Sequence, residues 1–172
     1  MIASFIKTLR LLLLGMWLGA AMLFGAAVAP ALFGVLRGAG LVNANELAGS
    51  IVTRLLAFIN KGGFEVALFL FVTAFFIDRQ RQAIARAAEM ISIAIMAIMT
   101  GISNWIISAR MLELRRSMGA PIDQVSPADP RRVSFDSLHR YSVIVMGVAI
   151  VAALVAFLIA SWRRDNQTLE TD

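Results

Sequence analysis

The chain alternates between long uncharged stretches and short charged connections. Residues 11–36, 90–109 and 141–162 contain no charged side chain, and a fourth apolar stretch, residues 64–77, contains only Glu65. A helix needs about 20 apolar residues to cross the roughly 30 Å hydrocarbon core of a bilayer. The pattern therefore predicts an all-α fold, an integral membrane four-helix bundle. We expect one domain over residues 1–172, with spans at about 9–36, 58–78, 89–110 and 137–162.

The second span is the unusual one, because its uninterrupted apolar part is too short to cross. Extending it back to Lys61 gives enough length but places Glu65 at least one turn inside the apolar slab. An amphipathic helix is expected before this span, with Asn43 and Glu46 at the spacing of a capping box. That helix either lies on the membrane surface or continues directly into span two.

Small residues recur at a spacing of four in the first span. In lipid, small residues let two helix backbones approach closely. This row predicts helix packing, either within the bundle or in a homodimer seam. Pro30 removes a backbone hydrogen bond and should kink the end of the span. The predicted packing residues are Gly15, Gly19, Gly25 and Pro30.

Polar residues collect where the end of span one, the start of span two, the end of span three and the start of span four share one membrane face. Ionisable groups in the apolar slab usually face the bundle interior and find partners. Two interpretations stay open: these groups hold and anchor the helices, or they line a small cleft that binds an ion, a proton or a polar ligand. The candidate ligand-binding residues are Lys61, Glu65, Thr100, Asn104, Arg110, His139 and Arg140.

Composition supports the membrane interpretation and removes several chemistries. The chain is 59% hydrophobic and has 16 Lys and Arg against 11 Asp and Glu, a net charge of +5. The basic residues lie at the ends of apolar blocks, where they anchor helices at lipid headgroups, so we expect no nucleic-acid partner. Without cysteine there are no disulfides or thiolate sites, and with His139 as the only histidine a bis-histidine haem within one chain is impossible. No catalytic motif is present, so we expect no catalytic residues, no metal and no cofactor.

The location and orientation are also expectations. Lys7, Arg10 and the Ala27–Ala29 segment are similar to a signal peptide, but the apolar run is about twice the usual length, which favours a retained first helix. We expect a multi-pass protein of the bacterial inner (plasma) membrane. Seven basic residues lie on the side of the termini and nine on the other side. The flanks of the first helix and the tight middle turn nevertheless favour cytoplasmic termini.

Three segments carry a resemblance to a known family. They are Gly15–Gly19 through Pro30 and Phe33, Ser103–Trp105 through Arg110, and Phe135–Ser142. In their order and spacing the chain resembles the bacterial membrane proteins of the domain-of-unknown-function family 4149, which are similar to eukaryotic transmembrane-protein-205-like proteins. The resemblance implies a four-helix membrane bundle and no assigned reaction.

A weaker likeness, in Trp17 to Phe33, is to four-span proteins of copper resistance and protoporphyrinogen oxidation. This first helix contains no histidine, so their haem or metal ligation does not carry over. The sequence favours a non-enzymatic protein: a small transport-related, binding or assembly subunit in the lipid bilayer, alone, as a homo-oligomer or with a membrane-protein partner. The alternatives are a haem- or porphyrin-linked membrane oxidoreductase and a structural, self-associating scaffold.

Overall fold

The computed structural model describes residues 2–77 and 83–169, and within them every regular element is a helix. Four long rods follow one another along the chain. The first rod consists of α1 (Ile2–Leu23), the π-helix η1 (Phe24–Val28) and α2 (Ala29–Gly38), and the second is α3 (Ala44–Ile77). The third rod consists of α4 (Ala83–Gly101), the π-helix η2 (Ile102–Ile107) and α5 (Ser108–Met118). The short 3₁₀-helix η3 (Ile122–Gln124) precedes the fourth rod, α6 (Pro130–Leu169).

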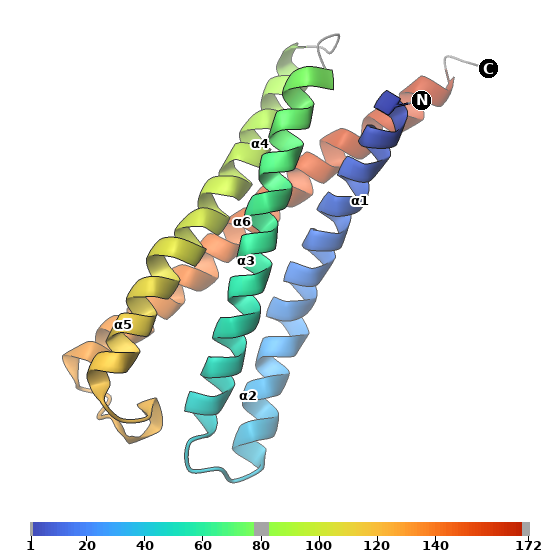
Figure 1. The fold of residues 1–172 in the computed structure, drawn as a ribbon. Helices are drawn as coiled ribbons and strands as arrows, with labels where there is room; N and C mark the ends of the chain where they lie inside the picture. The colour runs from blue at the N-terminus through green and yellow to red at the C-terminus, as the bar shows by residue number, and fades with distance from the viewer. Residues whose placement is uncertain (1, 78–82, 170–172) are drawn as a thin grey trace.

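Each rod contains an apolar segment long enough to cross a membrane. These segments are Ser4–Gly38, Ala44–Ala74, Ala83–Met118 and Pro130–Trp162. The prediction of an all-α membrane protein with four apolar helices is therefore confirmed, and the protein is a multi-pass membrane protein. In Figure 1 the start of α1 and the end of α6 lie at one end of the molecule, and the connections α2–α3 and α5–α6 lie at the other. That the chain forms a single domain stays a prediction.

The second rod is much longer than the sequence pattern indicated. α3 has 34 residues, about 51 Å at 1.5 Å per residue, and continues without a break from Ala44 to Ile77 (Figure 1). The expected amphipathic helix is therefore the first part of α3 rather than a separate element. The crossing is not short, because residues upstream of Lys61 contribute to it. Sequence alone left this open, since the Gly62–Gly63 pair resembles a break.

The main core lies where the rods face one another. Its buried apolar residues come from α1, α3, α4 and α6, and the contribution of α6 consists of alanines. They are Leu14, Trp17, Leu18, Ala21, Ala67, Leu70, Ile93, Met96, Ala149, Ala152, Ala153 and Ala156. Small side chains on one helix let the larger ones of its neighbours pack close to its backbone, which is how helices associate in lipid.

Two buried polar contacts tie the rods together. At the end of the molecule where α1 begins, Arg10 and Glu89 form an ion pair of 2.7 Å with both side chains almost fully buried. Between α3 and η2, the Asn60 side-chain amide donates to the Ser103 hydroxyl at 2.8 Å, and both residues are buried. A charged or polar group in a low-dielectric interior needs such a partner, so each contact fixes how two rods sit against each other.

The two π-helices have different surroundings. η1 directly precedes Pro30, whose ring would collide with the carbonyl four residues earlier in a regular α-helix, so the wider π turn accommodates the proline. In η2 the Ser103 carbonyl accepts both the backbone N–H and the hydroxyl of Ser108. The structure thus has a π segment ahead of Pro30, and the kink itself stays a prediction.

Candidate functional site

A cleft of about 650 Å³ opens among α2, α3, α5 and α6, at the end of the molecule that holds the α2–α3 turn and the α5–α6 loop. This is the membrane face at which the sequence pattern placed the polar residues. Charged and polar residues contribute to its lining: Arg37, Asn45, Thr53, Ser108, Arg115, Arg132, Asp136, His139 and Ser142. Apolar residues and glycines complete it: Pro30, Phe33, Gly34, Gly49, Val52, Leu56, Met111, Ile122 and Phe135.

The cleft changes in character with depth. Arg37, Asn45, Arg115 and Arg132 lie at the ends of their helices nearest the loops, whereas the apolar residues of α3 lie further in. Leu56 follows Asn45 by 11 positions, about 16 Å along α3. The hydroxyl of Thr53, on this inner wall, already donates to the Gly49 carbonyl of its own helix. The cleft therefore has a cationic outer part and an inner part in which the apolar Val52, Leu56 and Met111 lie beside the polar Ser108, His139 and Ser142.

Arg115 is the most firmly held of the three arginines. Its Nε lies 3.4 Å from a carboxylate oxygen of Glu46, and its Nη1 donates to the Ser50 hydroxyl at 3.2 Å. The guanidinium carbon also lies 5.4 Å from the centre of the Phe135 ring, a cation–π distance. A Cβ on Gly49 would approach the Arg115 Nη2 to 2.7 Å, so the glycine makes room for the guanidinium.

Arg37 and Arg132 complete the cationic part from α2 and α6. The Arg37 Nε donates to the Asn45 side-chain oxygen at 2.7 Å, and its guanidinium carbon lies 5.4 Å from the centre of the Phe33 ring. Arg132 donates through Nη1 to the Val125 carbonyl. The Nε atoms of Arg115 and Arg132 are both buried and make no hydrogen bond within the described residues, although that of Arg115 forms the ion pair with Glu46. Buried donors of this kind are suited to an anionic acceptor.

The loop between α5 and α6 is fastened across the mouth of the cleft by one carboxylate. Asp123 accepts the Glu46 backbone N–H at 3.0 Å and the Asn45 side-chain amide at 2.6 Å, so a loop residue caps the start of α3. Burial alone would raise the pKa of Asp123, but these hydrogen bonds outweigh it and hold the pKa below its ordinary value of 3.8.

The predicted Asn43–Glu46 capping box is wrong because both side chains bond to the same loop. The Glu46 carboxylate accepts the Ile122 backbone N–H at 3.2 Å, and the Asn43 side-chain oxygen accepts from Gln124 at 3.1 Å. A loop 75 or more residues away in sequence offers these partners, and no local pattern could reveal that.

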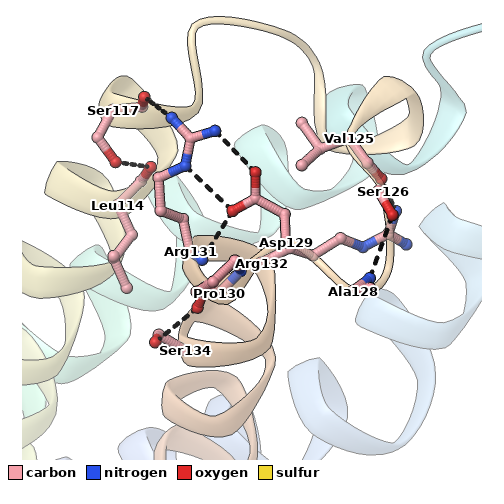
Figure 2. A network of polar contacts seen from close by, with 10 residues as sticks. All are labelled: Leu114, Ser117, Val125, Ser126, Ala128, Asp129, Pro130, Arg131, Arg132 and Ser134. Carbon is pink, nitrogen blue, oxygen red and sulfur yellow. Dashed lines mark hydrogen bonds and ion pairs between the residues drawn. The ribbon is translucent and has the colours of Figure 1, made fainter.

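The same loop fixes the start of α6 through a second aspartate. Figure 2 shows the Arg131 guanidinium between the Asp129 carboxylate, at 2.7 and 3.1 Å, and the Ser117 carbonyl, at 2.6 Å. Asp129 also accepts the Arg131 backbone N–H at 2.8 Å and caps α6, with Pro130 as the first helical residue. The Arg131 side chain beside it lowers the pKa of Asp129 to about 2. The helix thus starts before residue 137, where the apolar pattern had placed the beginning of the fourth span.

Of the seven predicted ligand-binding residues, only His139 lines this cleft, and the structure does not bring the others together. The side chains of Lys61 and Glu65 are 68% and 64% exposed on α3, with 3.9 Å between Nζ and Oε1. The expectation that Glu65 faces the bundle interior therefore differs from the structure. Thr100 is fully buried, and its hydroxyl donates to carbonyls of its own helix.

The remaining three predicted residues lie outside the cleft. Asn104 is half-buried in η2. Arg110 is exposed and pairs with Glu113 at 2.6 Å, and Arg140 is exposed and donates to the Ser137 hydroxyl at 3.4 Å. A ligand role for these residues stays a prediction. Asn104 follows the buried Thr100 by four positions, a spacing that drifts around a helix by about 40°, and the neighbouring Ser103 takes the buried position instead.

The predicted packing residues fall into two groups. A Cβ on Gly15 would contact the Phe157 ring at 3.3 Å, so Gly15 packs against α6 within the molecule. Gly19 and Gly25 are exposed with open space where a Cβ would lie, and Pro30 lies at the cleft. The closest approach in this part of the molecule was not predicted: a Cβ on Gly63 would come within 2.4 Å of the Trp17 indole nitrogen.

The residues that sequence analysis missed are the three arginines of the cleft. From the sequence pattern, these arginines are predicted only to anchor their helices at the lipid headgroups. Their signal was present as the placement of Arg37, Arg115 and Arg132 at the ends of three helices that share one face. Nothing in the pattern separated them from the other cations on that face. Among the described residues, no group of three His, Asp or Glu could hold a metal ion.

Comparison with known proteins identifies the family to which this chain belongs. The family model described as Domain of unknown function (DUF4149) matches residues 12–120, well over half of the chain. A four-span helical membrane protein with a polar cleft at one face thus belongs to this family. No curated protein and no solved structure matches the chain. The matched residues end before α6, so the Phe135–Ser142 segment, with His139, lies outside them.

Proposed function

We propose that the protein is a non-enzymatic membrane protein that binds an anionic amphiphile in the arginine-lined cleft. The observation that carries this proposal is the convergence of Arg37, Arg115 and Arg132 from three helices on one cleft. Asp136 is the only acidic residue among the described residues of the lining, and the Glu46 carboxylate pairs with Arg115, so the three arginines leave the lining with a net positive charge. A guanidinium recognises phosphate or carboxylate oxygens through paired N–H donors.

The apolar residues of the inner part support an amphiphile rather than a small inorganic anion. A headgroup at the arginines would leave its acyl chain against Val52, Leu56 and Met111. These side chains would keep the acyl chain away from water, as the bilayer core does. The site is therefore suited to lipids or fatty acids with an anionic head, as a carrier or accessory subunit in lipid handling would require.

The proposal also includes the membrane in which the protein lies and its orientation there. We place the protein in the bacterial inner membrane with both termini in the cytoplasm, so the cleft faces the outer side. The flanks of the first helix and the shared side of the chain ends support this orientation. Arg10 is buried against Glu89, so it acts as a structural partner in addition to its position in that flank.

A binding measurement on the detergent-solubilised protein tests the proposed ligand. Three probes separate the contributions: a single-chain lysophosphatidic acid, the zwitterionic lysophosphatidylcholine and inorganic phosphate. We expect the anionic lipid alone to raise the thermal unfolding midpoint at micromolar concentration. Arg132→Gln should weaken its affinity by about tenfold or more, since a hydrogen bond to a charged group contributes roughly 1.5–3 kcal/mol.

Arg110→Gln is the matched control because it removes an exposed arginine at the same face but outside the cleft. It should leave the affinity unchanged. Arg37→Gln gives a second cleft variant that keeps the Arg132 contact to the loop. Equal stabilisation by the zwitterionic lipid, or unchanged affinity in both cleft variants, would contradict the proposal.

A further inference from the structure

One charged pair lies on the outside of the molecule at a depth where charge is expensive. The side chains of Lys61 and Glu65 are 68% and 64% exposed, and both project from the middle part of α3. They are separate from the cleft. Apolar residues of the same exposed face flank them along α3: Phe58, Leu68 and Val72.

Contacts with neighbouring rods fix the depth of this pair. Gly63, between the two charged residues, packs against Trp17, which follows the charged Arg10 by seven positions, or about 10 Å. Phe64 packs against Gly101 and stacks edge-on with Trp105 at 4.8 Å. Gly101 lies 12 positions after Glu89 and nine before Arg110, about 18 and 14 Å from the two charged limits of its rod. On α3 itself, the exposed Arg54 precedes Lys61 by seven positions, about 10 Å, so the pair lies inside the apolar slab, two turns from the nearest other charged residue of its helix.

The two side chains extend towards each other rather than towards either headgroup layer. The Lys61 Nζ is 3.9 Å from the Glu65 Oε1, so the lysine leans towards the glutamate. A glutamate side chain is too short to reach the surface from such a depth, unlike a lysine that snorkels. Ionisable residues inside a membrane almost always face protein or water rather than lipid.

We propose that this face of α3 is covered by a second copy of the same chain. A two-fold axis along the membrane normal brings two parallel α3 helices together through the same patch, as an isologous interface requires. Between Phe58 and Val72 the patch is self-complementary, because there it carries one positive and one negative charge, 3.9 Å apart. Lys61 of each copy then reaches Glu65 of the other, and four charges form one neutral, lipid-excluded cluster, with the flanking Phe58 and Leu68 packed around it.

Charge reversal between differently tagged copies tests the contact directly. Glu65→Lys gives a chain with two positive charges at the patch, and Lys61→Glu gives one with two negative charges. Neither has its internal pair, so only contact between copies can restore attraction. After co-expression, we expect the mixed pair to be recovered at least tenfold more than either like pair. The matched control reverses the equally exposed Arg110–Glu113 pair, which should not change association.

A second measurement does not depend on altering the charges. The chain has no cysteine, so a single Leu68→Cys substitution gives an unambiguous cross-link under oxidation in liposomes. We expect disulfide-linked dimers from Leu68→Cys and none from Val151→Cys, an exposed position on α6 (53% and 61% exposed). Equal cross-linking at the two positions, a monomeric wild-type protein in bilayers, or no preference for the mixed pair would overturn the proposal.

Discussion

At the scale of single residues, the structure depends on a few close contacts that only one side chain permits. The Trp17 indole donates to the Ile59 carbonyl at 2.9 Å while its ring lies directly on the α3 backbone at Gly63. Any larger residue at position 63 would push the ring away and break this bond between α1 and α3. Of these two neighbouring glycines, Gly63 is therefore needed for packing, whereas a Cβ on Gly62 would meet open space.

Alanine substitution separates these two glycines. Gly63→Ala should lower stability by about 1–3 kcal/mol, because the new Cβ would overlap the indole and overpacking has that cost. Gly62→Ala should be neutral or stabilise by up to about 1 kcal/mol, since alanine is the better helix former. Thermal unfolding of both variants in detergent measures the difference. Equal midpoints would show that Trp17 does not lie on Gly63.

At the scale of elements, the sequence predicted which segments are helical but not how their ends are held. Charge-free stretches located all four rods because lipid leaves a spanning segment no other way to satisfy its backbone. The ends depend on partners distant in sequence: Asp123, 77 residues after Glu46, caps α3. The apolar pattern also missed the polar first turns of α6, because Asp129 and Pro130 start that helix before its apolar part.

The two capping aspartates make the α5–α6 loop sensitive to acid. Their pKa values are lowered in the folded state, that of Asp129 to about 2. A group with a depressed pKa stabilises the fold above its unfolded pKa, near 3.9, and loses that contribution as pH falls through the folded value. We therefore expect the loop to stay closed at pH 5 and to loosen progressively between about pH 4 and pH 2.

Limited proteolysis by pepsin follows this change at residues 119–129. Asp129→Asn should already show, at pH 5, the faster cleavage that the wild type reaches only at low pH. Asp172→Asn, at the end of the chain, is the control for a simple change of charge. A wild-type cleavage rate that stays constant from pH 5 to pH 2, after correction for the activity of pepsin, would contradict the capping role.

At the scale of the whole molecule, the alternation of helix directions predicted the face on which the cleft lies, but of the seven predicted ligand-binding residues only His139 lines that cleft. It brings the ends of α2 and α5 and the starts of α3 and α6 together, and the cleft lies there. It could not distinguish inward from outward side chains, because every rod on that face carries several cations. Lys61 and Glu65 were expected to face the bundle interior because ionisable groups in the apolar slab usually do, but both side chains project outward from α3.

The central claim is that the cleft holds an anionic headgroup at its arginines and an acyl chain along its inner wall. Photolabelling in bilayers, with an anionic single-chain lipid that has a diazirine in its chain, tests this most directly. We predict cross-links to Val52, Leu56 and Met111, and their loss in Arg132→Gln. Labelling confined to the exposed outer faces of α3 and α6, unchanged by that substitution, would contradict the account.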